Sequence, residues 1–131
     1  MNWKKGILIS ILILIVGFLS LVIYNKINFN ESIQSLNINN IDISKVVNGK
    51  FTGQFKLSYI SAKVAVVVEN GSISSVEILE HIQERGKKAE SIIIKQVLTR
   101  QSLDVDTVTG ATASSKVILK AIEIALQTGK V

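Results

Sequence analysis

The sequence contains neither cysteine nor proline, and it has a single histidine, His81. Without cysteine the chain can form no disulfide bond, Cys-ligated zinc site or iron–sulfur cluster, and it offers no thiol nucleophile or lipobox cysteine. One histidine excludes a His-rich metal site, and we expect no bound metal. A hydrolase is also disfavoured, because the sequence has no nucleophile elbow and His81 would have to serve every base role.

Basic residues are not clustered beyond the N-terminal region. The chain has 15 Lys and Arg against 10 Asp and Glu, which gives a net charge of +5. Three of these cations, Lys4, Lys5 and Lys26, flank one apolar segment, so residues 27–131 keep a balance of only +2. That part has no group of Lys and Arg interleaved with aromatic residues, so we predict that the protein does not bind nucleic acid.

A long apolar run lies near the N-terminus. Ile7–Tyr24 carries no charge and is interrupted only by two serines and a glycine. At a rise of about 1.5 Å per residue, an 18-residue helix is about 27 Å long, close to the thickness of the hydrocarbon core of a bilayer. A cleaved signal peptide is the alternative, but its apolar region usually has about 7–15 residues and ends in a small-x-small site. We therefore predict a retained transmembrane anchor over residues 1–26.

The charges around this run predict its orientation. Lys4, Lys5 and the terminal amine precede it, whereas Lys26 alone follows it directly. The positive-inside rule then keeps the N-terminus in the cytoplasm. We expect a single-pass protein of the cell membrane whose residues 27–131 lie outside the cytoplasm.

The part after the anchor divides by composition. Residues 27–47 are rich in Asn and Ser with scattered Ile and Leu, which is typical of a tether, with a short helix near Asp42–Val47. The remaining residues, 48–131, show no internal repeat and form one predicted domain.

The first half of this domain is predicted to be a β-meander. Apolar residues alternate along Lys50–Ile60, and Lys63–Glu69 is β-branched and almost wholly apolar, as in a central strand. Asn70-Gly71 then predicts a type I′ hairpin turn into the strand Ser72–Glu80. The apolar spacing in that strand shifts by one residue, which indicates a bulge near Ser74-Ser75.

The second half is predicted to be helical. Lys88–Thr99 and Ser114–Gln127 both place apolar residues on one stripe, and Gly129 follows the second stripe as a stop signal. Two helices on one face of a meander make an α+β fold.

A stretch rich in hydroxyl and small residues joins the two predicted helices. Gly110 and Ala111 allow close approach to the backbone, whereas Thr112, Ser114 and Ser115 supply hydroxyl groups. The amide groups and dipole of a helix start favour an anion such as phosphate. The residues alone also fit a plain N-cap, so both interpretations stay open at this point.

Residues 106–115 read DTVTGATASS and precede the second helix. This string resembles the D-x-x-(S/T)-G-A-T-x-(S/T)-S signature of the FMN-binding domain family. That family includes flavoprotein subunits of the sodium-translocating NADH:quinone oxidoreductase and of Rnf complexes, and small membrane-anchored flavoproteins. The strands upstream are also similar, so the resemblance runs over roughly residues 47–127.

The resemblance implies a covalent cofactor. In the family, an Mg-dependent flavin transferase cleaves FAD and esterifies the FMN phosphate onto the last Thr of the box, here Thr112. Asp106, Thr109, Gly110 and Ala111 would complete the recognition sequence for the transferase. No local histidine base accompanies the box, so we expect a separate transferase rather than self-modification. The residues predicted to bind the cofactor are Thr112, Thr109, Gly110, Ala111, Ser114, Ser115 and His81.

One loop departs from the family pattern. Relatives carry H-x-E-T-P-G after the second long strand, and residues 81–86 here read HIQERG. His81, Glu84 and Gly86 correspond, whereas the Thr and Pro are missing. His81 is therefore either a flavin contact or an exposed loop residue.

The resemblance implies an electron-transfer flavoprotein more than an independent enzyme. Its flavin would carry electrons from a membrane dehydrogenase to an acceptor outside the cytoplasm. Two alternatives stay open: a flavin-free, membrane-tethered binding or assembly module of the same fold, and a flavoprotein subunit of an Rnf-type ion-pumping complex.

Overall fold

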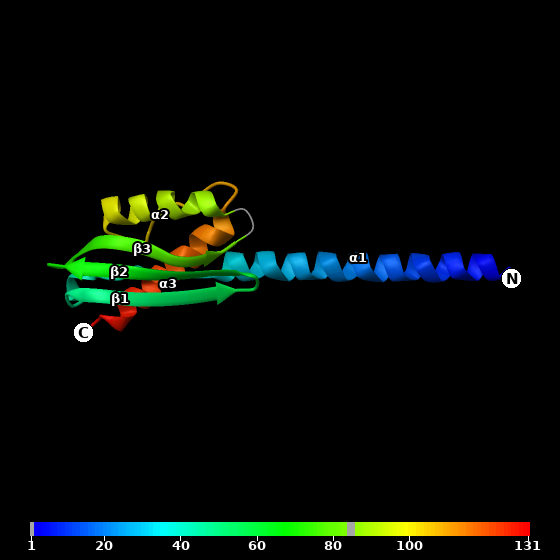
Figure 1. Cartoon of the computed structure of the whole chain (residues 1–131), viewed down its shortest axis with the longest axis horizontal. Helices are drawn as coiled ribbons and strands as arrows, with labels where there is room; N and C mark the ends of the chain where they lie inside the picture. The colour runs from blue at the N-terminus through cyan, green and yellow to red at the C-terminus, as the bar shows by residue number, and fades with distance from the viewer. Residues whose placement is uncertain (1, 84–85) are drawn as a thin grey trace. The chain divides into compact units, whose positions relative to one another are not determined.

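The computed structural model describes residues 2–83 and 86–131. The chain forms two compact units, Met1–Ser35 and Leu36–Val131. The first unit is a single helix, and the second is an α+β domain of three strands and two long helices (Figure 1). The elements in chain order are α1 (Trp3–Ser35), the 3₁₀ helix η1 (Ile43–Lys45), β1 (Gly49–Leu57), β2 (Ile60–Glu69), β3 (Ser72–Ile82), α2 (Lys87–Arg100) and α3 (Thr112–Thr128).

Helix α1 has the length and composition of a membrane span. It contains 33 residues, and an 18-residue window within it reaches a mean hydropathy of 3.0 with no part of that window buried by protein. Large apolar side chains such as Leu14 and Phe18 are exposed on it. A helix that is apolar all round suits a lipid environment. In the described part of the chain, α1 is the one helix long and apolar enough to cross a membrane.

Helix α1 extends beyond the predicted anchor. It continues to Ser35, so the first part of the predicted tether over residues 27–47 is helical rather than irregular. Neither proline nor glycine follows Tyr24 in this stretch to stop the helix, and the Ser32 hydroxyl donates to the Asn28 carbonyl at 2.8 Å. At about 1.5 Å per residue the helix spans ~50 Å, which exceeds the ~30 Å hydrocarbon core.

The rest of the predicted tether packs onto the α+β domain. Ile41, Ile43 and Val46 are buried, so this segment is not a free linker. The short helix predicted near Asp42–Val47 is confirmed as η1. The Asp42 side chain accepts a hydrogen bond from the Ser44 amide at 3.2 Å, which is an N-cap contact.

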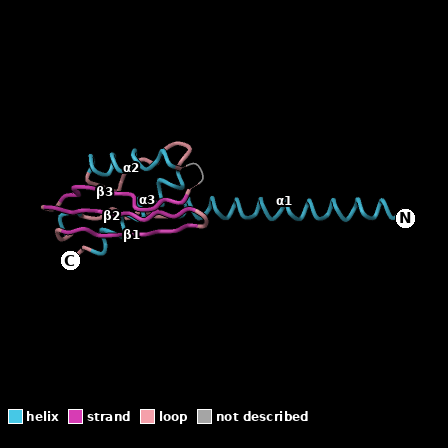
Figure 2. The backbone as a smooth tube through the Cα atoms, in the orientation of Figure 1, coloured by secondary structure: helices cyan, strands magenta, loops and turns pink. Residues whose placement is uncertain are grey.

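The three strands form an antiparallel meander in the order β1-β2-β3 (Figure 2). The turn between β2 and β3 is the predicted Asn70-Gly71 pair, with φ of 52° and 73°. The predicted bulge is also confirmed: Val67 pairs with Ser75 and Val68 with Ile73, which leaves Ser74 without an opposite residue.

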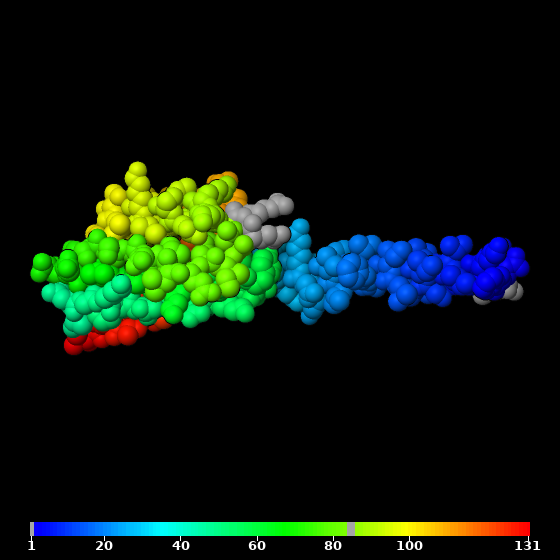
Figure 3. All heavy atoms as spheres, viewed as in Figure 1, coloured from blue at the N-terminus to red at the C-terminus, as the bar shows by residue number. Residues whose placement is uncertain are grey.

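Both helices cover one face of this sheet. Helix α3 crosses behind β1 and β2 and α2 lies along β3 (Figure 1). Val64, Val66 and Val68 of β2 and Ile118 and Ile122 of α3 are fully buried between the layers. The opposite face of the sheet is left uncovered by the helices (Figure 3). Its exposed residues on β1 and β3 are mostly polar, for example Thr52, Gln54 and Glu77.

Gly53 sets how closely α3 approaches the sheet. A Cβ atom at this position would lie 2.0 Å from the Ala121 carbonyl oxygen and 2.5 Å from the Ala125 amide nitrogen. Both atoms belong to the α3 backbone, which cannot move aside without lifting the helix.

Candidate functional site

Helix α3 starts without a side-chain cap. It begins at Thr112, two residues before the predicted start at Ser114, and its N-cap is Ala111. The first bond of the helix runs from the Ser115 amide to the Ala111 carbonyl at 2.9 Å. Within residues 2–83 and 86–131, the amides of Thr112, Ala113 and Ser114 donate no hydrogen bond. Three donors therefore point out of the helix start, where they favour an anion.

The loop before α3 is folded into a tight turn. The Ala111 amide donates to the Val108 carbonyl at 2.9 Å, and Gly110 has a φ of 76°, which favours glycine. The Ser115 side chain is fully buried, and its hydroxyl accepts from the Val108 amide at 3.0 Å and donates to the Ala111 carbonyl at 2.7 Å. Ser115 thus holds the turn against the helix, and its assignment as a cofactor contact stays a prediction.

The predicted recognition residues differ in exposure. Asp106, Thr109 and Gly110 are exposed, Ala111 is buried, and Thr112 is half-buried at the first position of α3. The Thr112 hydroxyl has no hydrogen-bond partner in the part of the chain that the structure describes. Its neighbours in the turn, Thr109, Gly110 and Ala111, have small side chains, which leaves the backbone of this turn open to close approach.

His81 is not an exposed loop residue. Strand β3 continues to Ile82, and the His81 side chain is only 1% exposed. Its Nδ1 lies 2.7 Å from Glu90 Oε1 on α2, and its Nε2 lies 3.2 Å from Ser114 Oγ on α3. His81 therefore ties β3, α2 and α3 together, and its contact with a flavin stays a prediction.

The start of α2 also touches the start of α3. A Cβ on Gly86 would overlap the Ser114 hydroxyl, at 1.8 Å, so only glycine fits there. Ser114 is itself buried at 2% exposure, between Gly86 and His81. Of the remaining residues of the predicted loop, Glu84 lies outside the described part. Neither the Glu90 partner of His81 nor the Gly86 contact gave a signal in the sequence.

Positive charge flanks the start of α3. The Lys88 ammonium lies 3.1 Å from where a Cβ of Gly110 would be, above the turn. Lys116 follows Thr112 by one helical turn, and its ammonium donates to the Leu36 carbonyl at 3.4 Å. The exposed Asp106 carboxylate lies 3.6 Å from the Arg100 guanidinium, and the Asp106 amide donates to Gln96 Oε1 at 3.1 Å. Lys88 and three amide donors thus favour a phosphate near Thr112, whereas the Lys116 ammonium lies toward the segment that follows α1.

A groove of about 340 Å³ adjoins this region. Its walls are the segment 36–40, the loop 103–107, and Lys116 and Leu119 of α3. Small-molecule sites typically measure ~300–1,000 Å³ and combine apolar walls with a few polar groups, as this groove does. Elsewhere among the described residues, no group of three or more His, Asp or Glu side chains is placed to hold a metal ion.

The fold and the site define an α+β domain with a half-buried threonine at an uncapped helix start and a groove next to it, a combination that suits a phosphorylated aromatic ligand. The family model of the FMN-binding domain matches residues 58–127, more than half of the chain. The protein therefore belongs to the FMN-binding domain family, as its sequence signature predicted. The match starts later than the resemblance near residue 47, so β1 lies outside it. No curated protein matches the chain.

Proposed function

We propose that the protein is a membrane-anchored electron carrier whose FMN is attached through a phosphoester to Thr112. The observation that carries the proposal is the first turn of α3, where the hydroxyl of the half-buried Thr112 and three amide donors make no hydrogen bond within the described residues. In the ester, these amides and Lys88 would hold the phosphate, while Thr109 and Gly110 leave room around it. The bound flavin would supply the redox chemistry, and the protein would supply its placement and electrostatic surroundings.

The attachment needs a second protein. The Thr112 oxygen attacks the flavin-side phosphorus of FAD, the pyrophosphate bond breaks, AMP leaves, and a base takes the hydroxyl proton. In the described residues, the one imidazole is bonded to Glu90 and Ser114 rather than to Thr112, so no local base activates the hydroxyl. We therefore infer that a separate Mg-dependent, FAD-using flavin transferase carries out the reaction. Thr112 is its substrate.

Helix α1 gives the carrier its location. A span held in the cell membrane, with the N-terminus in the cytoplasm, leaves the flavin domain on the outer side. A covalent flavin is not lost to the medium there. Anchoring also raises the effective concentration of the domain near a quinone- or flavin-linked membrane dehydrogenase, from which electrons would pass to an acceptor outside the cytoplasm.

The proposal is tested by co-expressing the full chain with a flavin transferase. We expect flavin fluorescence to remain on the protein after denaturing electrophoresis, with a mass increase of one FMN phosphoester. Thr112→Ala should abolish both signals. Thr128→Ala, at the far end of the same helix, is the matched control and should keep them. Covalent flavin on the Thr112→Ala protein would refute the assignment.

One observation favours a second function, a flavin-free tethered module of the same fold. His81, which would be a ring contact in a typical flavin loop, is enclosed between α2 and α3. A colourless, unmodified protein in cells that contain an active transferase would support this alternative. Membership of an Rnf-type complex would instead require co-purification with several multispan proteins.

A further inference from the structure

The groove beside α3 has a mixed lining. Leu36 and Asn40 come from the segment that follows α1, Leu103 and Val105 from the loop before the Thr-Gly-Ala-Thr box, and Leu119 from α3. A flat ring system with polar edges needs such apolar walls together with a few hydrogen-bonding groups. The groove therefore has the chemistry of an aromatic-ligand site.

The groove lies within reach of Thr112. Lys116, which lines it, is four residues after Thr112 on α3, so the two side chains share one face of the helix, one turn apart. One turn measures about 5.4 Å, and the extended five-carbon ribityl chain of FMN is longer than that. Thr107, in the loop that leads to the box, also lines the groove. A ring tethered at Thr112 can therefore enter it.

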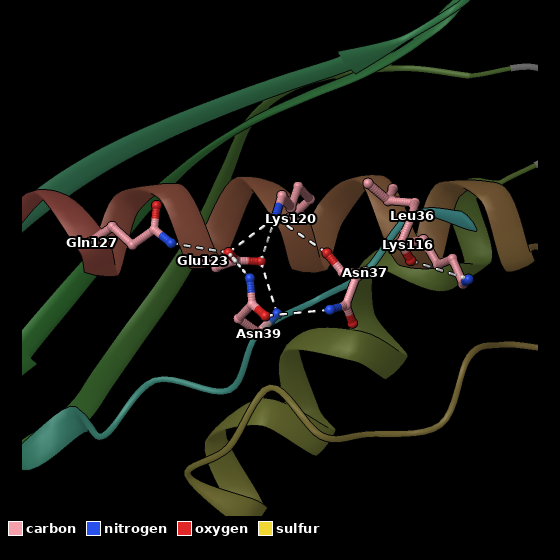
Figure 4. Close-up of polar contacts among 7 residues, drawn as sticks. All are labelled: Leu36, Asn37, Asn39, Lys116, Lys120, Glu123 and Gln127. Atoms are coloured by element: carbon pink, nitrogen blue, oxygen red, sulfur yellow. Dashed lines mark hydrogen bonds and ion pairs between the residues drawn. The ribbon is translucent and has the colours of Figure 1, made fainter. Parts of the chain in front are cut away.

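One wall of the groove is held by a buried carboxylate. Glu123 is 1% exposed and accepts hydrogen bonds from the Asn39 amide at 3.1 Å, the Asn39 side chain at 3.2 Å and Gln127 Nε2 at 3.0 Å (Figure 4). The Lys120 ammonium lies 2.9 Å from Glu123 Oε2 and donates to the Asn37 carbonyl at 3.2 Å. These contacts fix the segment 36–40 along α3.

The same wall is tied to the opposite side of the groove. Asn40 Oδ1 accepts from the Leu103 amide at 3.0 Å and from the Ser102 hydroxyl at 3.2 Å. These hydrogen bonds join the two walls without a ligand, and a groove formed in advance lowers the entropic cost of binding. The segment 36–40 lies outside the residues matched by the family model, 58–127.

We propose that this groove receives the isoalloxazine ring of the flavin carried on Thr112, and that Lys116 supplies positive charge beside the ring. The inference rests on the proposed function and adds the place of the ring and the role of the segment 36–40. A cation near the ring favours its reduced, anionic form, so Lys116 would raise the midpoint potential. Lys116 is a positioning and tuning residue here.

The test uses the full-length, flavinylated protein in detergent. Val105→Phe narrows the groove, and Val47→Phe is the matched control in a second groove, of about 350 Å³, lined by residues 44–47 and Val131. We expect covalent flavin on both variants, with a several-fold higher iodide quenching constant for Val105→Phe alone. If iodide quenched the flavin on Val105→Phe to the same extent as the flavin on the wild-type protein, the groove would not be the site of the ring. Absence of covalent flavin from the unmodified sequence would overturn the proposed function and this inference together.

Lys116 gives an independent readout. Lys116→Gln should shift the flavin midpoint potential to more negative values, and Lys116→Arg should restore it, since Arg keeps the charge. Lys95→Gln, on the exposed side of α2, is the control and should leave the potential unchanged. A potential that does not move in Lys116→Gln would overturn the assigned role.

Discussion

The two ends of α3 differ in how their polar groups are satisfied. Near its C-terminal end, Glu123 accepts hydrogen bonds from Asn39 and Gln127 and pairs with Lys120. At its first turn, three amides and the Thr112 hydroxyl have no partner among the described residues. Buried polar groups in proteins are almost always paired, so the first pattern holds the fold together. The second pattern lies nearer the surface and leaves amide groups that can donate hydrogen bonds to a ligand.

Gly53→Ala should have the largest effect on stability, because it disrupts the packing of the C-terminal half of α3, where the polar groups are paired, against the sheet. Its Cβ would collide with the backbone at Ala121 and Ala125, and we expect a loss of about 3 kcal/mol in the free energy of unfolding. Urea titration of the full chain in detergent, followed by circular dichroism, measures it. Thr52→Ala, at the next, exposed position of β1, should change stability by less than ~0.5 kcal/mol. Equal effects of the two changes would contradict the close approach.

Glu123→Gln should come next. Its single carbonyl oxygen cannot accept from every present donor, and its amide group would face the Lys120 ammonium, so we expect a loss of about 2 kcal/mol. Faster hydrogen exchange in residues 36–40 should accompany the loss. Glu77→Gln removes an exposed pair with Lys50 at 3.8 Å and should cost less than ~0.5 kcal/mol. Unchanged exchange in residues 36–40 would show that Glu123 does not hold this segment.

Ser115→Ala tests the N-terminal end of α3, where polar groups lack partners within the described residues, and should have a smaller effect on stability. It removes the acceptor of the Val108 amide and should cost about 1 kcal/mol. Because the turn before Thr112 would loosen, we also expect less flavin attached by the transferase. Hydrogen exchange at Val108 and in-gel flavin fluorescence measure the two effects. Ser75→Ala, on the outer face of the sheet, is the control. If Ser115→Ala showed fast exchange at Val108 but full flavin loading, the order of this turn would not be needed for recognition by the transferase.

The smallest expected effect is on the pH dependence of η1, which has the side-chain N-cap that α3 lacks. The Ser44 hydroxyl, which donates to Asp42, lowers the pKa of that carboxyl, with further help from the Ser44 amide and Lys45. Because the folded-state pKa is depressed, the contribution of Asp42 is present above the ordinary aspartate pKa. It is lost as the pH falls through the lowered value. Asp42→Asn keeps a cap oxygen and should remove this pH dependence from hydrogen exchange in Ser44–Val46. If hydrogen exchange in Ser44–Val46 kept the same dependence on acid pH in Asp42→Asn, other carboxylates would be responsible for it.

Local signals in the sequence predicted much of the fold. The Asn70-Gly71 turn, the bulge at Ser74 and the apolar stripe of α3 depend on residues that are neighbours along the chain, and all three are confirmed. The FMN-binding signature likewise lies within ten consecutive residues. Such features need no knowledge of which distant segments meet.

The features that the sequence did not predict depend on distant partners. From the sequence, His81 was assigned to a loop, because its partners Glu90 and Ser114 come from two helices, α2 and α3, that follow it in the chain. Glu123 reads as an ordinary polar position between two isoleucines, since its partner Asn39 is 84 residues away along the chain. The helical part of residues 27–35 was missed because its composition is poor in strong helix formers, although no breaking residue interrupts it.

The turn at Gly110 bears on the order of events during maturation. Asp106, Thr109 and Gly110 are exposed in the folded domain, so the proposed transferase could reach them without unfolding it. In the proposed carrier, flavin attachment can therefore follow folding, and a protein that lost its flavin by hydrolysis of the ester could be loaded again.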